Sequence, residues 1–179
     1  KITSFQNLYN EIQNSIEKID INLSQKDNIF IEEVPSRGLI YTIRHEKNFK
    51  SDIIPVSRWF EVFEIIRKNR LKAESSIMAT YHNQPLEQFL KSDCELEISM
   101  AVEDSPSFPF YKKTPSFRAV CTFHRGSLSG LINTYAKAIK WLNARNMQIN
   151  GAITEEFLIS PTDVNDENDY LTKIIIPVK

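Results

Sequence analysis

Two adjacent glutamates, Glu155 and Glu156, are the residues of this sequence best placed to do chemistry. In an extended segment alternate side chains share a face, so Glu155 is expected beside Phe157 and Glu156 on the opposite face. A carboxylate among aromatic rings is costly to bury unpaired, so it takes up a proton or binds a cation. We therefore expect Glu155 to face a ligand. A register slip of one residue would exchange the two glutamates, and a solvated edge for both is the alternative.

Aromatic side chains on neighbouring segments could surround a bound cation. Each ring placed over a positive charge contributes ~0.5 to 2 kcal/mol. The candidates are Tyr81, Phe157, Tyr170, Trp59, Trp141 and Phe110. Both tryptophans also fit helical core spacing, so packing is their alternative role. Phe110 lies in a proline-containing segment that joins two halves of the chain and that reads equally as a lid or as a packed linker.

Metal and cofactor chemistry find no support in the motifs. His45, His82 and His124 lie far apart, and neither Cys94 nor Cys121 belongs to a CxxC pair, so no metal site is expected. No phosphate-binding, dinucleotide or nucleophile-elbow motif occurs, so we expect neither a cofactor nor a catalytic residue. Two thiols in separate apolar segments are typical of a reducing compartment, and a cytoplasmic location is expected.

Composition excludes several function classes. The 179 residues are 41% hydrophobic and 25% charged, which predicts one globular domain with a possible helical appendage. The 22 basic and 23 acidic residues give a net charge of -1, so the chain itself has no basic field for nucleic acid. No apolar run reaches about 18 residues, so no membrane association is expected.

The elements that would position these residues occur in the same order twice, as strand, helix, strand, strand. In the first half we expect one strand over 29–34 and 39–44, interrupted at 35–38, then a helix at 55–70 and strands at 77–82 and 94–102. In the second half we expect a strand at 117–123, a helix at 128–146 and strands at 153–159 and 170–178. This order predicts an α+β fold of two βαββ repeats, about 28–102 and 116–179, joined by a linker at 103–115. Both helices would pack on one face, with a ligand-binding concavity near the pseudo-two-fold axis.

Matching positions in the two halves support the repeat. Positions 81 and 102 are 21 residues apart, as are 157 and 178, so the last two strands of each half correspond in register. The proposed equivalents are Tyr81 with Phe157, Val102 with Val178, Trp59 with Trp141, and Arg37-Gly38 with Arg125-Gly126.

A heptad pattern precedes the repeats. Its apolar positions, with spacings that alternate between three and four, are Ile2, Phe5, Tyr9, Ile12, Ile16, Ile19 and Leu23. A period near 3.5 favours a coiled-coil helix at 1–24 that forms a homodimer, and packing on the rest of the chain is the alternative. Because the pattern is already helical at Lys1, we expect the chain to be a piece of a longer protein.

A pattern shared with known proteins covers 79–82 with the strand that ends at 102, then 123–128 (FHRGSL), 139–142 (IKWL), 151–161 and 170–178. In this order the segments resemble the GyrI-like (gyrase-inhibitory-protein-like) effector-binding domains of AraC- and MerR-type transcription regulators. The resemblance covers 28–179 and implies a pair of SHS2-like repeats that bind hydrophobic, often cationic drugs. It also implies that an acidic residue on the strand at 153–159 meets the cation, which points to Glu155. The helix at 1–24 is similar to the layout of MerR-type regulators, whose DNA-binding domain would be missing here.

The resemblance implies alternatives as well. Some GyrI-like proteins are small-molecule hydrolases, in which Glu155 with Tyr81 or Tyr170 would activate water, and others bind gyrase as protein-interaction modules. We expect a sensor, not an enzyme. Lys173 departs from the family pattern, which often has an acidic residue there. If Lys173 lies on the face opposite Thr172 and Ile174, this change does not affect the site; if not, it competes for Glu155.

Overall fold

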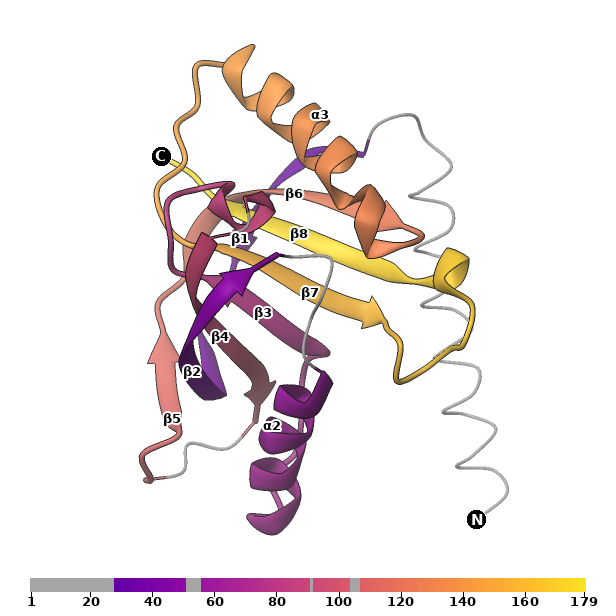
Figure 1. Ribbon diagram of the computed structural model, residues 1–179. Coiled ribbons are helices and arrows are strands. Elements are labelled where there is room, and N and C mark those ends of the chain that lie inside the picture. Colours follow the sequence, from indigo (N-terminus) through magenta and orange to yellow (C-terminus); the bar gives the residue numbers. More distant parts are fainter. Residues whose placement is uncertain (1–27, 51–55, 91, 104–106) are drawn as a thin grey trace, which may run out of the picture.

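The computed structural model describes residues 28–50, 56–90, 92–103 and 107–179. The predicted helix at 1–24, with all seven residues of its apolar seam, lies outside these ranges. The described residues form one eight-stranded sheet in the order β1-β6-β8-β7-β3-β4-β2-β5, and every neighbouring pair is antiparallel (Figure 1). The strands are β1 (Phe30–Val34), β2 (Arg37–Phe49), β3 (Ile77–Tyr81), β4 (Ser92–Val102), β5 (Tyr111–Thr114), β6 (Phe117–Arg125), β7 (Ile153–Ile159) and β8 (Leu171–Pro177).

The two halves of the sheet are related by a pseudo-two-fold axis between β3 and β7. Across this central pair Ile77 lies opposite Phe157, Ala79 opposite Glu155 and Tyr81 opposite Ile153. The axis therefore exchanges Tyr81 with Phe157, as the repeat predicts. The α+β fold of two βαββ repeats is confirmed.

Each repeat carries one further strand, and these two strands are exchanged between the halves. β1 pairs with β6 of the second half, while β5 pairs with β2 of the first. β5 was not predicted and lies in the segment expected to be a linker. Proline precedes β2 at position 35 and β6 at position 115, where the chain crosses from one half to the other. Proline suits these crossings because it cannot donate a hydrogen bond to a ladder.

The exchange corrects one predicted equivalence. Arg37 is the first residue of β2, whereas Arg125 is the last residue of β6. Arg37-Gly38 and Arg125-Gly126 are therefore not equivalent. The same two residue types recur, but at opposite ends of the corresponding strands. The chain positions that do correspond are the Pro-Ser pairs at 35–36 and 115–116.

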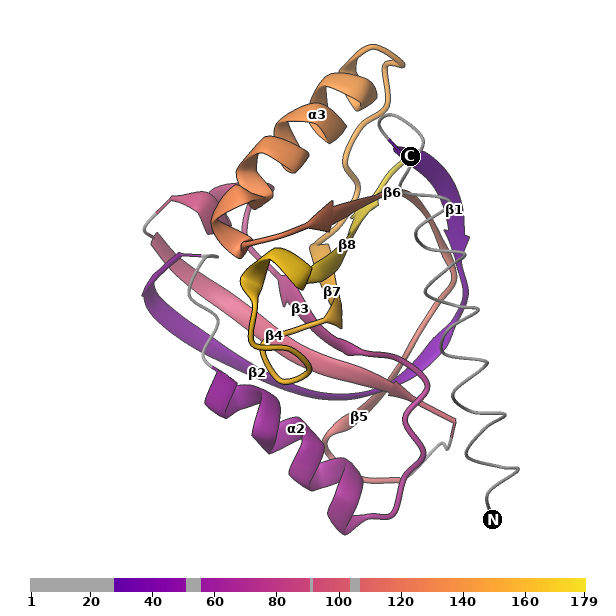
Figure 2. The same cartoon turned by 90° about the vertical axis from the view of Figure 1, so that its right-hand side faces the viewer.

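Both helices, α2 (Val56–Lys68) and α3 (Leu131–Asn143), lie on the same face of a curved sheet (Figure 2). Trp59 and Val62 of α2 pack with β3 and β4 in one core cluster, and Leu131 and Leu142 of α3 pack with β6 and β8 in another. Trp59 lies in the first turn of α2 but Trp141 in the last turn of α3, so the predicted equivalence of the tryptophans is wrong.

Three short 3-10 helices complete the described structure: η1 (Glu87–Phe89), η2 (Leu128–Gly130) and η3 (Glu167–Asp169). η2 and α3 replace the single helix predicted at 128–146. In the described parts of the chain, no helix combines the length and hydropathy needed to cross a membrane.

Candidate functional site

A fully buried carboxylate lies at the centre of the helix-bearing face. Glu155 sits in the middle of β7, next to the pseudo-axis, and its exposed fraction is 0%. The Tyr81 hydroxyl at the end of β3 donates a 2.8 Å hydrogen bond to its Oε2. The Tyr135 hydroxyl on α3 donates a 2.8 Å hydrogen bond to its Oε1. Both halves of the chain thus contribute to holding one acidic group.

Burial sets the proton affinity of this carboxylate. Loss of solvent raises the pKa of Glu155 to about 7, although the two tyrosine hydrogen bonds act to lower the pKa. Burial and the neighbouring carboxylate raise the pKa of Tyr81 and Tyr135 well above 10, so both hydroxyls keep their protons and remain donors. Within the described ranges no lysine or arginine pairs with Glu155. Its two partners are neutral, and a positive charge beside it would be favoured.

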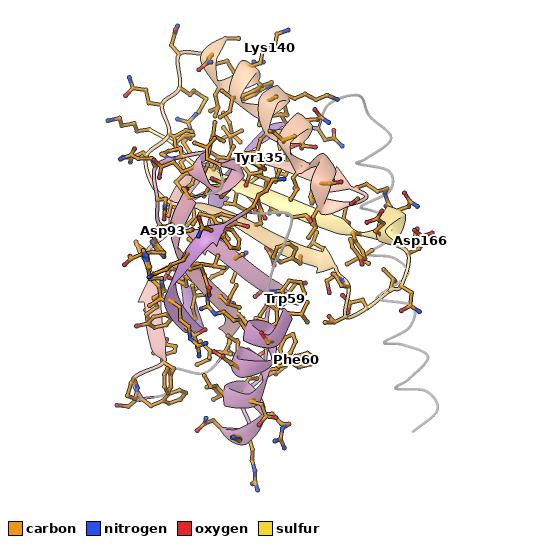
Figure 3. All side chains as sticks on the ribbon, in the orientation of Figure 1. Trp59, Phe60, Asp93, Tyr135, Lys140 and Asp166 are labelled. Carbon is orange, nitrogen blue, oxygen red and sulfur yellow. The ribbon has the colours of Figure 1, made fainter. Side chains whose placement is uncertain are left out.

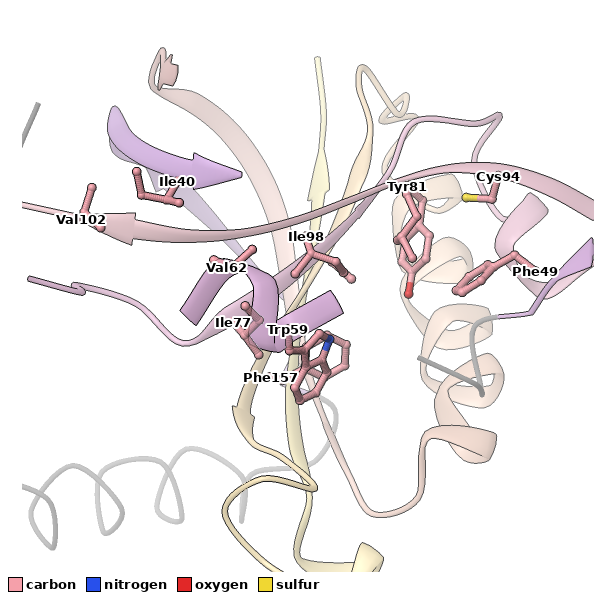
Figure 4. Packing of buried hydrophobic residues seen from close by; sticks show 12 residues of the cluster. Ile40, Phe49, Trp59, Val62, Ile77, Tyr81, Cys94, Ile98, Val102 and Phe157 are labelled. Carbon is pink, nitrogen blue, oxygen red and sulfur yellow. The ribbon is translucent and has the colours of Figure 1, made fainter. Parts of the chain in front are cut away.

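Aromatic rings surround the carboxylate on both sides. The Trp59 ring of α2 packs against the Phe157 ring (Figure 4), and their centroids are 5.0 Å apart. The Tyr81 ring lies 5.9 Å from that of Phe49, and the Tyr135 ring meets Phe89 edge-to-face at 4.8 Å. Trp59 and Tyr135 come from different helices (Figure 3). The π faces of such rings attract cations and also provide an apolar contact surface.

An apolar pocket of about 520 Å³ adjoins this group between α3 and η1. It is lined by Leu86, Phe89, Ile132, Tyr135, Ala136, Ile139, Lys140 and Asn143. Its volume falls in the range of small-molecule sites. Tyr135 belongs both to the pocket wall and to the hydrogen-bonded group around Glu155, so this side chain connects the pocket with the carboxylate.

The sequence model of one protein family, described as the GyrI-like small molecule binding domain, matches residues 27–179. The chain belongs to the GyrI-like family. The match includes both repeats, and therefore both helices and every strand of this GyrI-like domain. None of the curated proteins matches the chain.

Solved structures share this GyrI-like fold at low sequence identity. The C-terminal domain of EcmrR, a MerR-family protein, has a TM-score of 0.70 and 16% identity, over 87% of this chain and 99% of that one. EcmrR bound to DNA gives a TM-score of 0.67, also at 16% identity, over 98% of this chain and 69% of that one. A hydrolase encoded by lin2189 from Listeria innocua gives 0.58 at 12% identity, over 91% and 97%. SAV2435 bound to tetraphenylphosphonium gives 0.56 at 12% identity, over 85% and 94%.

From the sequence, Glu156 could have replaced Glu155 in the site, and Lys173 could have paired with Glu155. Both residues lie on the other face of the GyrI-like sheet. Glu156 is directly opposite Lys173 in the β7–β8 pair and lies 3.9 Å from Arg37. The Lys173 ammonium donates a 2.6 Å hydrogen bond to Glu32 on β1. Because Thr172 and Ile174 are buried on the helix side, Lys173 does not compete for Glu155.

The structure brings together four of the seven residues predicted to bind ligand: Glu155, Tyr81, Phe157 and Trp59. The other three lie outside this hydrogen-bonded and stacked group. The Trp141 ring is covered by the Arg145 guanidinium at 3.7 Å. Tyr170 follows η3, where its carbonyl accepts a hydrogen bond from the Gly126 N–H, and Phe110 is 48% exposed before β5. Their roles in ligand binding remain predictions.

Sequence reasoning missed Tyr135 as a member of the site. The side chain is buried, with 1% of it exposed. The sequence feature that could have identified Tyr135 is its hydroxyl group, since a tyrosine at a core position of an amphipathic helix needs a hydrogen-bond partner. No cluster of three or more potential metal ligands occurs in the described part of the chain.

Proposed function

We propose that this GyrI-like domain senses hydrophobic organic cations, with the charge of the ligand placed against Glu155. The observation that carries the proposal is the 0% exposure of Glu155 with only two neutral hydroxyl partners among the described residues. A buried carboxylate without a counter-charge is unfavourable when ionised, and a cation brought beside it relieves that penalty. A neutral ligand of the same shape has no such advantage.

The surroundings of Glu155 suit the apolar part of such a ligand. Trp59, Phe157 and Tyr81 supply ring surface, and the pocket beside Tyr135 supplies volume. Because Tyr135 lines this pocket and also donates to the carboxylate, we propose that a ligand displaces its hydroxyl from Glu155 on entry. The structure of SAV2435 with tetraphenylphosphonium supports a cation on this fold.

We further propose that the domain is the effector-binding part of a MerR-type transcription regulator. The similarity of its fold to EcmrR, which was solved in complex with DNA, supports this assignment. DNA would then be bound by a domain outside this sequence, and the helix predicted at 1–24 would join two copies. Ligand binding would act on DNA through that helix, with no reaction catalysed.

Two probes of the same shape and opposite charge test the ligand class. Tetraphenylphosphonium should raise the melting temperature of the protein, because a ligand that binds only the folded state stabilises it by mass action. Tetraphenylborate should not. Glu155→Gln should abolish the stabilisation by the cation, whereas Glu156→Gln, on the other face of β7, should retain it. Equal stabilisation by both probes, or a full response of Glu155→Gln to the cation, would refute the proposal.

Hydrolysis of a small molecule is the second candidate. A carboxyl group with a pKa of about 7 is suited to act as a general base, and the lin2189 hydrolase has this fold. Both oxygens of Glu155 already accept tyrosine hydrogen bonds, so an attacking water would have to replace one of them. Consumption of a stabilising compound during incubation, measured by chromatography, would establish the hydrolase; its full recovery supports the sensor.

A further inference from the structure

Four buried side-chain atoms have no hydrogen-bond partner in the described structure: the Nε of Arg58 and three atoms on residues that adjoin the site around Glu155. These three are the indole Nε1 of Trp59, the amide Nε2 of Gln88 and the hydroxyl Oγ1 of Thr172. The exposed fractions of these residues are 0%, 2% and 0%. Buried polar groups are nearly always paired, so each of these atoms calls for an explanation.

The residues that carry the first two atoms adjoin the site from different elements. Trp59 reaches the site from α2 and stacks on Phe157, two residues along β7 from Glu155. Gln88 belongs to η1, next to the Phe89 ring that packs on Tyr135, and its side chain lies beside the Tyr135 hydroxyl.

Thr172 completes the arrangement from β8. It lies directly opposite Phe157 in the β7–β8 ladder, while its neighbour on the same face, Ile174, lies opposite Glu155. Thr172 is therefore a diagonal neighbour of the carboxylate, a relation in which side chains of adjacent strands can reach the same ligand. Ile174 belongs to the core beneath α3, which places both residues on the helix-bearing face.

The chemistry of the three atoms is that of donors. An indole N–H and an amide NH2 can only donate, and a threonine hydroxyl can donate as well as accept. The site thus combines one carboxylate with a set of unused donors. A cation made only of hydrocarbon would satisfy the carboxylate and leave the donors unpaired. A cation that also carries oxygen acceptors would satisfy both.

We propose that the ligand of this site is an organic cation bearing carbonyl or ether oxygens next to its charged centre, selected by hydrogen bonds from Gln88, Thr172 and Trp59. This inference rests on the proposed function, because it assigns the ligand class of the same site. Gln88 and Thr172 are then specificity-determining residues, while Glu155 supplies the response to charge. Unpaired donors discriminate strongly between ligands that do and do not carry the matching acceptor.

A matched pair of permanently charged probes tests the selection. Phenacyl-trimethylammonium carries, one methylene from its charged nitrogen, a carbonyl oxygen where 2-phenylpropyl-trimethylammonium carries a methyl group. Titration calorimetry should give the phenacyl probe about threefold to tenfold higher affinity, the range expected for one added hydrogen bond. Gln88→Met or Thr172→Val, both close in shape to the native side chain, should reduce this ratio toward one. Gln148→Met, a change of an exposed glutamine, should leave the ratio unchanged.

The outcomes separate this inference from the proposed function. Equal affinities of the two probes for the wild type, with both lost in Glu155→Gln, would overturn the selection by donors and leave the cation site standing. A ratio that stays high in both Gln88→Met and Thr172→Val would also overturn it. If neither probe binds and tetraphenylphosphonium gives no stabilisation, the proposed function and this inference fall together.

Discussion

The carboxyl group of Glu155 titrates near neutral pH, and this gives ligand binding a pH dependence. Its pKa of about 7 means that roughly a tenth of the groups are ionised at pH 6 and roughly nine tenths at pH 8. Only the ionised form attracts a cation. We therefore expect the affinity for tetraphenylphosphonium to rise about tenfold from pH 6 to pH 8, measured by titration calorimetry. An affinity independent of pH, with Glu155 intact, would show that the carboxylate does not meet the charge.

The same group makes folding stability depend on pH, with the opposite trend. Since the pKa of Glu155 is higher in the native state than its ordinary 4.5, the native protein binds more protons than the unfolded chain between about pH 4.5 and 7. Stability is lost as the pH rises through this window. Glu155→Gln removes this loss. The free energy of unfolding of the variant minus that of the wild type should therefore be larger at pH 8 than at pH 5. We expect a difference of about 2 to 3 kcal/mol in urea denaturation. Identical pH profiles would contradict the burial of an ionisable group.

Single residues also show where sequence reasoning succeeds. The alternation of side chains along a strand was enough to put Glu155 and Phe157 on one face, because that period follows from backbone geometry alone. The partners of the carboxylate were harder to predict. Tyr135 reaches it from α3, and no local pattern encodes which tertiary neighbour satisfies a buried hydroxyl.

At the scale of elements, the two exchanged strands are tied to the sheet by ion pairs of opposite polarity. Glu32 on β1 reaches Lys173 on β8 at 2.6 Å, across the intervening β6. Lys112 on β5 reaches Glu97 on β4 at 2.6 Å, across the intervening β2. The two pairs occupy corresponding places about the pseudo-axis, with the acidic and basic partners reversed.

The pair on β5 yields a stability prediction. Glu97 is 2% exposed and its second partner is His82, at 2.8 Å. Despite burial, which acts to raise it, the hydrogen bonds of His82 and Lys112 hold the pKa of Glu97 below its usual 4.5. Lys112→Met leaves this buried carboxylate with one partner and should lower the free energy of unfolding at pH 7 by about 2 kcal/mol. Lys113→Met, at the adjacent exposed position, should change it by less than about 0.5 kcal/mol in the same urea titrations. Equal effects of both would assign the loss to strand propensity instead.

The order of elements was predictable from sequence, and the exchange of strands was not. Segments such as 77–82 and 153–159 show the composition and length of strands, so their existence and register follow from local signals. β5 spans four residues, Tyr111–Thr114, two of which are lysines. Such a segment has no apolar period, and only the free edge of β2 gives it strand structure. Pairing partners that are far apart in sequence leave no local trace.

Among the described residues, the helix-bearing face has one buried acidic group, Glu155, although the fold is nearly symmetric. The pseudo-axis pairs Glu155 of β7 with Ala79 of β3, directly opposite each other at the centre of the sheet. A methyl group in one repeat thus makes room for the carboxylate of the other, while Tyr81 and Phe157 remain as equivalent rings. The first repeat supplies Tyr81, and the second supplies Glu155 and Tyr135, so neither repeat could form the site alone.

The exchange of β1 and β5 predicts that both halves unfold together. Each half supplies an edge strand to the other, and β3 and β7 join them at the centre, so neither half retains a complete sheet once the other has melted. The tryptophans provide one fluorescent reporter per half, Trp59 in a Trp141→Phe background and Trp141 in a Trp59→Phe background. Leu142→Ala, in the core beneath α3, should destabilise the protein by about 2 to 5 kcal/mol. Leu142→Ala should shift the urea midpoint reported by Trp59 and the midpoint reported by Trp141 by the same amount. A shift seen by Trp141 alone would mean that the halves unfold independently and that the exchanged strands do not couple them.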